Sequence, residues 1–145
     1  MSYQMFRTKK DAKYDLGKSI ELMLANLNDL KENSSYETFE IVRVGRFIEG
    51  RAYYHEVDQY YTCVGFEVEV DTRFDFDGKL SEMERNVGFY SIWMGKSHEF
   101  APFTFEESYQ ELGKPHRFDN GLGDHLEIDT VLATIEDVTE ALKEL

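Results

Sequence analysis

One short stretch of the chain combines the residue types that hold metal ions or transfer protons. Asp124–Asp129 contains one histidine and three carboxylates, and Asp119 precedes it by a few residues. If this stretch is a β-strand, alternate side chains share a face, so His125, Glu127 and Asp129 lie together. Imidazoles and carboxylates bind divalent cations and act as acids or bases. The stretch is therefore a candidate metal or small-molecule site, and solvated acids on an exposed strand face are the alternative.

The other reactive side chains show no spacing that is typical of a catalytic centre. The four histidines lack the HxH and HExxH patterns of zinc sites, and no phosphate-binding glycine loop or nucleophile motif is present. The single cysteine, Cys63, lies in a predicted strand, where a buried and inert thiol is expected. We therefore expect no cofactor, and we favour a non-enzymatic role over a catalytic one.

The clearest chemical pattern is an alternation of acidic and apolar residues. Between Val64 and Phe76, apolar side chains alternate with four acids, which are Glu67, Glu69, Asp71 and Asp75. In a strand, the apolar side chains point to the core and the acids to the opposite face. Like charges on one face repel each other, so this face needs nearby arginines, solvent or a basic partner. We expect these four acids to attract a basic partner.

Arginines in the preceding strand offer a second interpretation of the acidic face. Residues 55–59 read as a hairpin loop, which pairs the strand before it with the acidic strand. Arg43, Arg46 and Arg51 lie in the first of these strands. A regular hairpin places Arg46 opposite Glu69, as a cross-strand ion pair. In this interpretation the arginines offset part of the acidic charge.

Two pairs of tyrosines flank the same hairpin loop, at positions 53–54 and 60–61. Neighbouring residues of a strand point to opposite faces, so one tyrosine of each pair faces away from the core. Tyrosines surrounded by acids are typical of the energetic centres of protein interfaces. We therefore predict that Tyr54, Tyr60 and Tyr61 contact the partner.

The net charge narrows the classes of partner. The chain has 29 acidic and 16 basic residues, for a net charge of −13, and its first 35 residues are close to neutral. The acidic charge therefore belongs to the folded body. It opposes direct nucleic-acid binding, which needs clustered Lys and Arg, and it attracts basic proteins. With a polar N-terminus, one cysteine and no long apolar run, we expect a cytoplasmic protein without a membrane partner.

The order of elements predicts one α+β domain over residues 1–145. Apolar periodicity and turn residues indicate a long helix over 10–31, strands over 39–54, 60–76, 87–94 and 125–131, a short helix over 105–112 and a helix after Thr134. Asp77-Gly78 is a hairpin-turn signal, and Thr134 with Asp137 is a helix-capping pattern. We expect an antiparallel β-meander sheet with the long N-terminal helix and the C-terminal helix packed on one face.

These features together predict a non-enzymatic acidic binding protein that inhibits or neutralises a basic protein partner. Charge and size of this kind are typical of immunity proteins and of DNA mimics encoded by phages. One alternative is a domain that binds a small molecule or a divalent metal through the acids and histidine of residues 119–129. An enzyme that uses the same residues is a version of this alternative. The other alternative is an oligomerising structural domain in which the tyrosines form an interface between copies of the chain.

Overall fold

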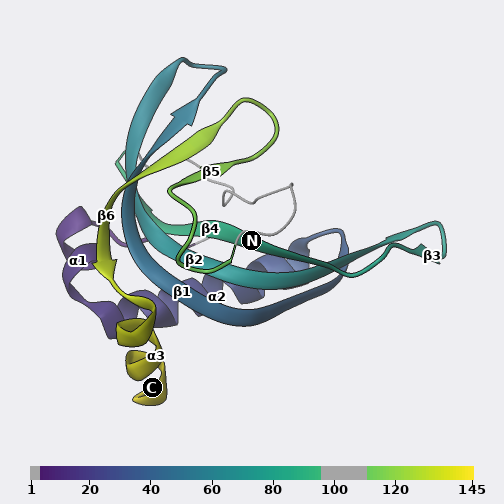
Figure 1. Cartoon of the computed structure of the whole chain (residues 1–145), viewed down its shortest axis with the longest axis horizontal. Coiled ribbons are helices and arrows are strands. Elements are labelled where there is room, and N and C mark those ends of the chain that lie inside the picture. The colour runs from purple at the N-terminus through teal and green to yellow at the C-terminus, as the bar shows by residue number, and fades with distance from the viewer. Residues whose placement is uncertain (1–3, 96–110) are drawn as a thin grey trace.

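The computed structural model describes residues 4–95 and 111–145, and it contains an antiparallel sheet with helices near both ends of the chain (Figure 1). The elements are α1 (Lys9–Tyr14), α2 (Leu16–Asn33), β1 (Tyr36–Tyr54), β2 (Gln59–Phe76), β3 (Lys79–Leu80), β4 (Glu84–Met94), β5 (Arg117–Asp119), β6 (His125–Ala133) and α3 (Ile135–Lys143). The predicted α+β class is confirmed. The helix predicted over 105–112 lies almost entirely outside the described residues.

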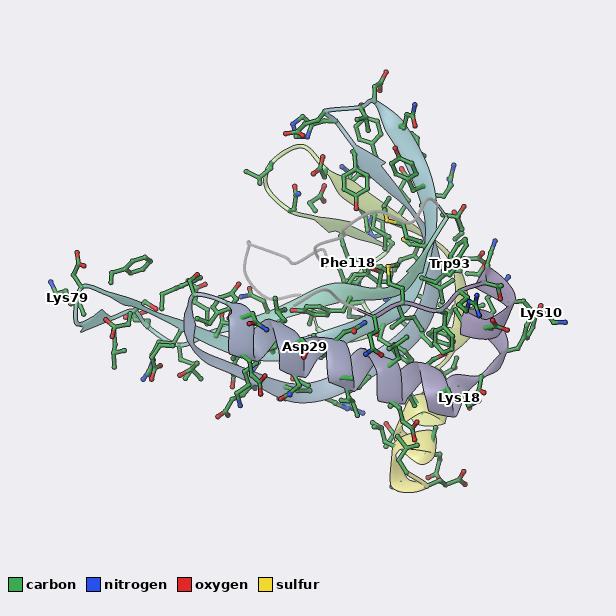
Figure 2. All side chains as sticks on the ribbon, turned by 180° about the vertical axis from the view of Figure 1, so that it is seen from behind. Lys10, Lys18, Asp29, Lys79, Trp93 and Phe118 are labelled. Carbon is green, nitrogen blue, oxygen red and sulfur yellow. The ribbon has the colours of Figure 1, made fainter. Side chains whose placement is uncertain are left out.

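The sheet is built around one long hairpin, formed by β1 and β2. β4 pairs with the other edge of β2, as a meander requires, whereas β6 pairs with the other edge of β1 and carries β5 on its outside. β6 covers β1 only from Phe47 to Tyr53, so the first part of β1 extends beyond β6. Together with the end of β2 and β3, this part of β1 forms an arm, and Lys79 marks its end (Figure 2).

The arm ends at the turn that the sequence predicts. Asp77 and Gly78 both have positive φ, at 53° and 81°. An Asp-Gly pair tolerates this backbone conformation, which reverses the chain tightly between paired strands. The turn connects β2 to β3, so the acidic strand ends where the sequence places its end.

The single long N-terminal helix of the prediction is wrong in one respect: the structure has two helices with a break at Asp15. Asp15 ends α1 and also caps α2, because its side chain accepts a hydrogen bond from the Lys18 N–H. An Asp at this position competes with the helical backbone and favours a cap. At the other end of the chain, the side chain of Thr134 and that of Asp137 cap α3 reciprocally, as predicted.

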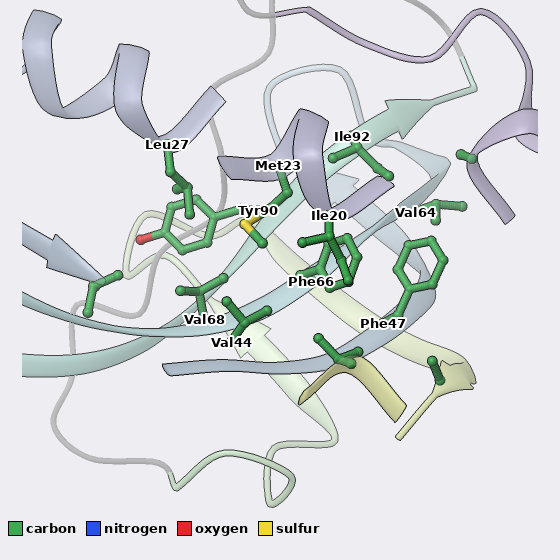
Figure 3. Close-up of a cluster of buried hydrophobic side chains, with 14 of the residues drawn as sticks. Ile20, Met23, Leu27, Val44, Phe47, Val64, Phe66, Val68, Tyr90 and Ile92 are labelled. Carbon is green, nitrogen blue, oxygen red and sulfur yellow. The ribbon is translucent and has the colours of Figure 1, made fainter. Parts of the chain in front are cut away.

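The two longer helices pack on the same face of the sheet, as the sequence analysis expects. Their buried residues join one apolar cluster with the strands (Figure 3), which includes Ile20, Met23 and Leu27 of α2, Val138 of α3, Phe47 of β1, Phe66 and Val68 of β2, and Tyr90 of β4. A second cluster lies on the opposite face, around Ile48, Phe89, Phe118 and Leu126. The sheet therefore has a core on both faces.

Candidate functional site

The first acid of the predicted acidic face, Glu67, is buried. Glu67 has no exposed surface, and its carboxylate lies 2.9 Å and 3.0 Å from Nε and Nη2 of Arg46. It also accepts hydrogen bonds from the backbone N–H groups of Arg46 and Gly113, both at 2.9 Å, and Arg46 donates to the carbonyl of Pro115. The prediction that Glu67 attracts a partner at the surface is therefore wrong, because a segment distant in sequence covers it.

Of the remaining three acids, Asp71 is the one that forms an ion pair with an arginine among the described residues. Asp71 binds Arg85 through two hydrogen bonds of 2.8 Å and 2.9 Å, which hold the pKa of the Asp71 carboxyl below its usual value. Glu69 is half-buried and pairs in register with Arg43, since irregularities in β1 shift the hairpin away from the predicted pairing with Arg46. Asp75 is exposed in the arm. Arginines thus pair with two of the four acids, Glu67 and Asp71, and for these two the interpretation with compensating arginines describes the structure better.

The tyrosines of the two pairs point to opposite faces, as predicted. Tyr54 and Tyr61 are half-buried, contact each other at 5.6 Å between ring centroids, and pack on the second apolar cluster. Burial raises the pKa of the Tyr54 hydroxyl. Tyr60 points to the other face and is 51% exposed. Of the three predicted contact tyrosines, only Tyr60 therefore offers a large exposed surface.

Tyr60 belongs to a polar surface made by four neighbouring strands, which we call the outer face. The outer face is on the same side of the sheet as the helices. It begins past the point where Lys9 and Lys13 of α1 form ion pairs with Glu49 of β1. Strand pairing sets its side chains in two rows, which are Tyr60, Tyr53, His125 and Asp119 in the first, and Thr62, Arg51, Glu127 and Arg117 in the second. Asp129 joins this surface through its ion pair with Arg51.

Three rings form the centre of the outer face. Tyr53 stacks on His125, with ring centroids 5.2 Å apart, and Tyr60 contacts both rings at 4.9 Å and 5.9 Å. The Tyr53 hydroxyl donates a hydrogen bond of 2.6 Å to Asp58, and this bond raises the pKa of Tyr53. This bond therefore joins the ring cluster to the β1–β2 loop.

Arg51 lies beside this cluster and contacts both an aromatic ring and two acids. Its guanidinium carbon is 5.8 Å from the centre of the Tyr60 ring. Its Nε is 3.2 Å from Oδ2 of Asp129, and its Nη2 is 3.4 Å from Oε2 of Glu127. All three charged side chains are between 38% and 51% exposed, and exposed pairs of this kind contribute only about 0–1 kcal/mol each.

A contact between two loops holds one edge of the outer face. Nδ1 of His55 lies 2.6 Å from Oδ1 of Asp124, and the backbone N–H of His55 donates to the same oxygen at 2.9 Å. The Asn120 amide donates to Oδ2 of Asp124. Burial alone would raise the pKa of Asp124, but the hydrogen bonds from His55 and Asn120 outweigh it and lower the pKa. The contact joins the β1–β2 loop to the β5–β6 loop.

This loop contact predicts a pH-dependent contribution to stability. Because the pKa of Asp124 is lower in the folded state, its carboxylate stabilises the fold above its unfolded pKa of about 3.9, and the contribution disappears as the pH falls through the folded pKa. We expect Asp124→Asn to lower the free energy of unfolding by about 1–3 kcal/mol near neutral pH. The difference from wild type should become small at low pH. Urea denaturation at several pH values measures it, and a difference that does not change with pH would contradict the prediction.

The acids and histidine that open the sequence analysis are close in space but are not arranged as metal ligands. Glu127 and Asp129 bind Arg51, and the His125 ring stacks on Tyr53. Asp119 binds Arg117. Over residues 4–95 and 111–145, no three His, Cys, Asp or Glu side chains are placed to share a metal ion. The thiol of Cys63 is buried, as expected, and burial raises its pKa.

Four members of the outer face were not predicted as part of a site from the sequence: Arg51, Tyr53, Thr62 and Arg117. From the sequence alone Arg51 reads as a partner for the acids of β2 and Tyr53 has no role, because the pairing of β1 with β6 is not visible there. A usable signal was present, since Glu49, Arg51 and Tyr53 alternate with Gly50 and Ala52. This alternation indicates a polar face of β1 at the end near the hairpin loop.

No protein-family model, curated protein or solved structure matches the chain. In the part of the chain that the structure describes, no helix is long and apolar enough to cross a membrane. The function is therefore inferred from the geometry of the chain itself.

Proposed function

We propose that the chain is a non-enzymatic binding protein that inhibits or neutralises a basic protein partner, and that the outer face is its contact surface. One observation carries the proposal: the half-exposed ring of Tyr60 belongs to a surface where acids outnumber arginines. The carboxylates on this face and the loops that border it are Glu56, Asp58, Asp119, Asp124, Glu127 and Asp129. The arginines paired with them are Arg51 and Arg117.

Each part of this surface has a physical role in binding. Tyrosine offers a large contact area that loses little conformational entropy, and it is enriched at the energetic centres of interfaces. The carboxylates and the net charge of −13 attract a basic protein over a distance and raise the association rate. The contact between His55 and Asp124 fixes the two loops before binding, which lowers the ordering cost.

Binding of this kind inhibits a basic partner by covering the cationic surface with which that partner acts. We place the protein in the cytoplasm, because its only cysteine is a buried thiol, which suits a reducing compartment. The strong net charge opposes association between copies of the chain, so it favours a different protein as the partner. The described residues give no specific support to the metal-binding alternative.

Affinity capture from the native host tests this proposal with a matched pair of variants. Glu127→Gln/Asp129→Asn removes two charges from the outer face, and Glu140→Gln/Glu144→Gln removes two exposed charges from the C-terminal end, around α3. We expect wild type and the C-terminal variant to recover a basic protein that rising salt releases, and the outer-face variant to recover much less. Equal recovery by both variants, or no basic protein with wild type, would overturn the proposal.

A further inference from the structure

The outer face already binds one guanidinium group, that of Arg51. The Arg51 guanidinium lies within cation–π range of the Tyr60 ring and reaches two carboxylates on its other side. It comes from β1, between Tyr60 on β2 and the two acids on β6, and these acids are more than seventy residues away in sequence. An aromatic face together with two acids is therefore built across three strands around one planar cation.

This arrangement suits arginine better than lysine. A guanidinium is planar, stacks on aromatic rings and presents several N–H donors to more than one carboxylate, whereas an ammonium is a compact and strongly hydrated point charge. Glu127 and Asp129 stand on the same strand and accept from different nitrogens of Arg51. The surface thus matches the fork of N–H donors on a guanidinium.

Arg51 is held loosely enough to be exchanged. Its hydrogen bonds to Asp129 and Glu127 are 3.3 Å and 3.4 Å long, whereas Arg85 binds Asp71 at 2.8 Å and 2.9 Å. Its side chain is half-exposed, so it can turn into solvent without leaving a buried charge behind. Two carboxylates around one cation also leave an excess negative charge at the site.

We propose that the outer face is a guanidinium-binding site, at which an arginine of the partner takes the place of Arg51 over the Tyr60 ring between Glu127 and Asp129. The inference rests on the proposed function and specifies it: the partner presents arginine, on a basic segment that reaches this face. Arg51 then acts as an internal competitor that occupies the site in the free protein.

Peptide binding tests this exchange without knowledge of the partner. The probes are an acetylated and amidated peptide of alternating arginine and glycine, and the same peptide with lysine. Their affinities are measured by NMR titration at low salt for wild type, Arg51→Gln and Arg117→Gln. Arg117 lies in the second row of the outer face and binds Asp119, so its replacement removes the same charge from this face without emptying the Tyr60 site.

We expect Arg51→Gln to bind the arginine peptide more tightly than Arg117→Gln does, by about twofold to fivefold, and to prefer arginine over lysine. Tyr60→Leu in the Arg51→Gln background should abolish that preference. Tyr60 is half-exposed, so this change should leave the fold intact, as the amide spectrum will report. The proposed site would be overturned if Arg51→Gln and Arg117→Gln gained the same affinity for the arginine peptide. It would also be overturned if Arg51→Gln bound the arginine and lysine peptides equally well.

The two proposals can fail separately. A captured basic protein together with no arginine preference in the peptides would overturn the guanidinium site and leave the proposed function standing. An arginine preference that depends on Tyr60, together with no captured basic protein, would support the site and overturn the proposed function.

Discussion

Replacing Glu67 with alanine is expected to lower the free energy of unfolding by about 3–5 kcal/mol. This loss is larger than the one expected for Asp124→Asn or Asp71→Ala. The Glu67 side chain is fully buried, and the partner side chain of Arg46 is only 15% exposed. Removal of the carboxylate leaves the Arg46 cation without its counter-ion, with only the Pro115 carbonyl as an acceptor, and leaves the Gly113 N–H without its acceptor. An unpaired buried charge costs much more than an exposed one, because water cannot replace the lost partner.

Chemical denaturation of wild type and Glu67→Ala measures this effect, and Asp71→Ala is the matched control. Asp71 also pairs with an arginine in two hydrogen bonds, but its partner Arg85 is half-exposed. We expect the control to lose about 1 kcal/mol or less. Replacing both partners by apolar residues, as in Arg46→Met/Glu67→Leu, should recover much of the loss. Similar losses in Glu67→Ala and Asp71→Ala would contradict the buried pairing.

Phe66→Ala is expected to lower the free energy of unfolding by about 3–5 kcal/mol as well, through a different mechanism. The Phe66 ring is fully buried beneath α2 and stacks on the Phe47 ring, with centroids 4.5 Å apart. Truncation removes apolar surface from the core and leaves a cavity where strands and helices meet.

The same substitution in the arm provides the control. Phe76 is 64% exposed and packs only against Phe74 among the aromatic rings of the described residues. We expect Phe76→Ala to change the free energy of unfolding by no more than about 0.5 kcal/mol. Thermal and urea denaturation of both variants give the comparison. A loss at Phe76 as large as that at Phe66 would mean that the arm belongs to the cooperative core.

Local signals in the sequence predict most of the elements. Alternation predicts the long β1–β2 hairpin, Asp77-Gly78 predicts the turn between β2 and β3, and Thr134 predicts the start of α3. These signals succeed because each depends on residues close together in the chain. The break at Asp15 is also local, but the continuous apolar periodicity of the segment conceals it.

The site depends on contacts that no local pattern contains. Glu67 reads as an exposed acid in its own strand, and only its coverage by residues 113–115 makes it a buried ion-pair partner. Arg51 reads as a partner for the acids of β2, and only the return of β6 beside β1 brings it to Glu127. Sequence analysis therefore identifies the charged residues but assigns them to the wrong pairs.

The most direct test of the central claim, that the outer face is the contact surface, is a map of amide chemical shifts in the labelled chain as the captured basic protein is added. We predict that the largest changes fall on residues 51–60 and 119–129, and that they weaken as salt is raised. Changes confined to the arm, around residues 71–85, or to α2 would contradict the account.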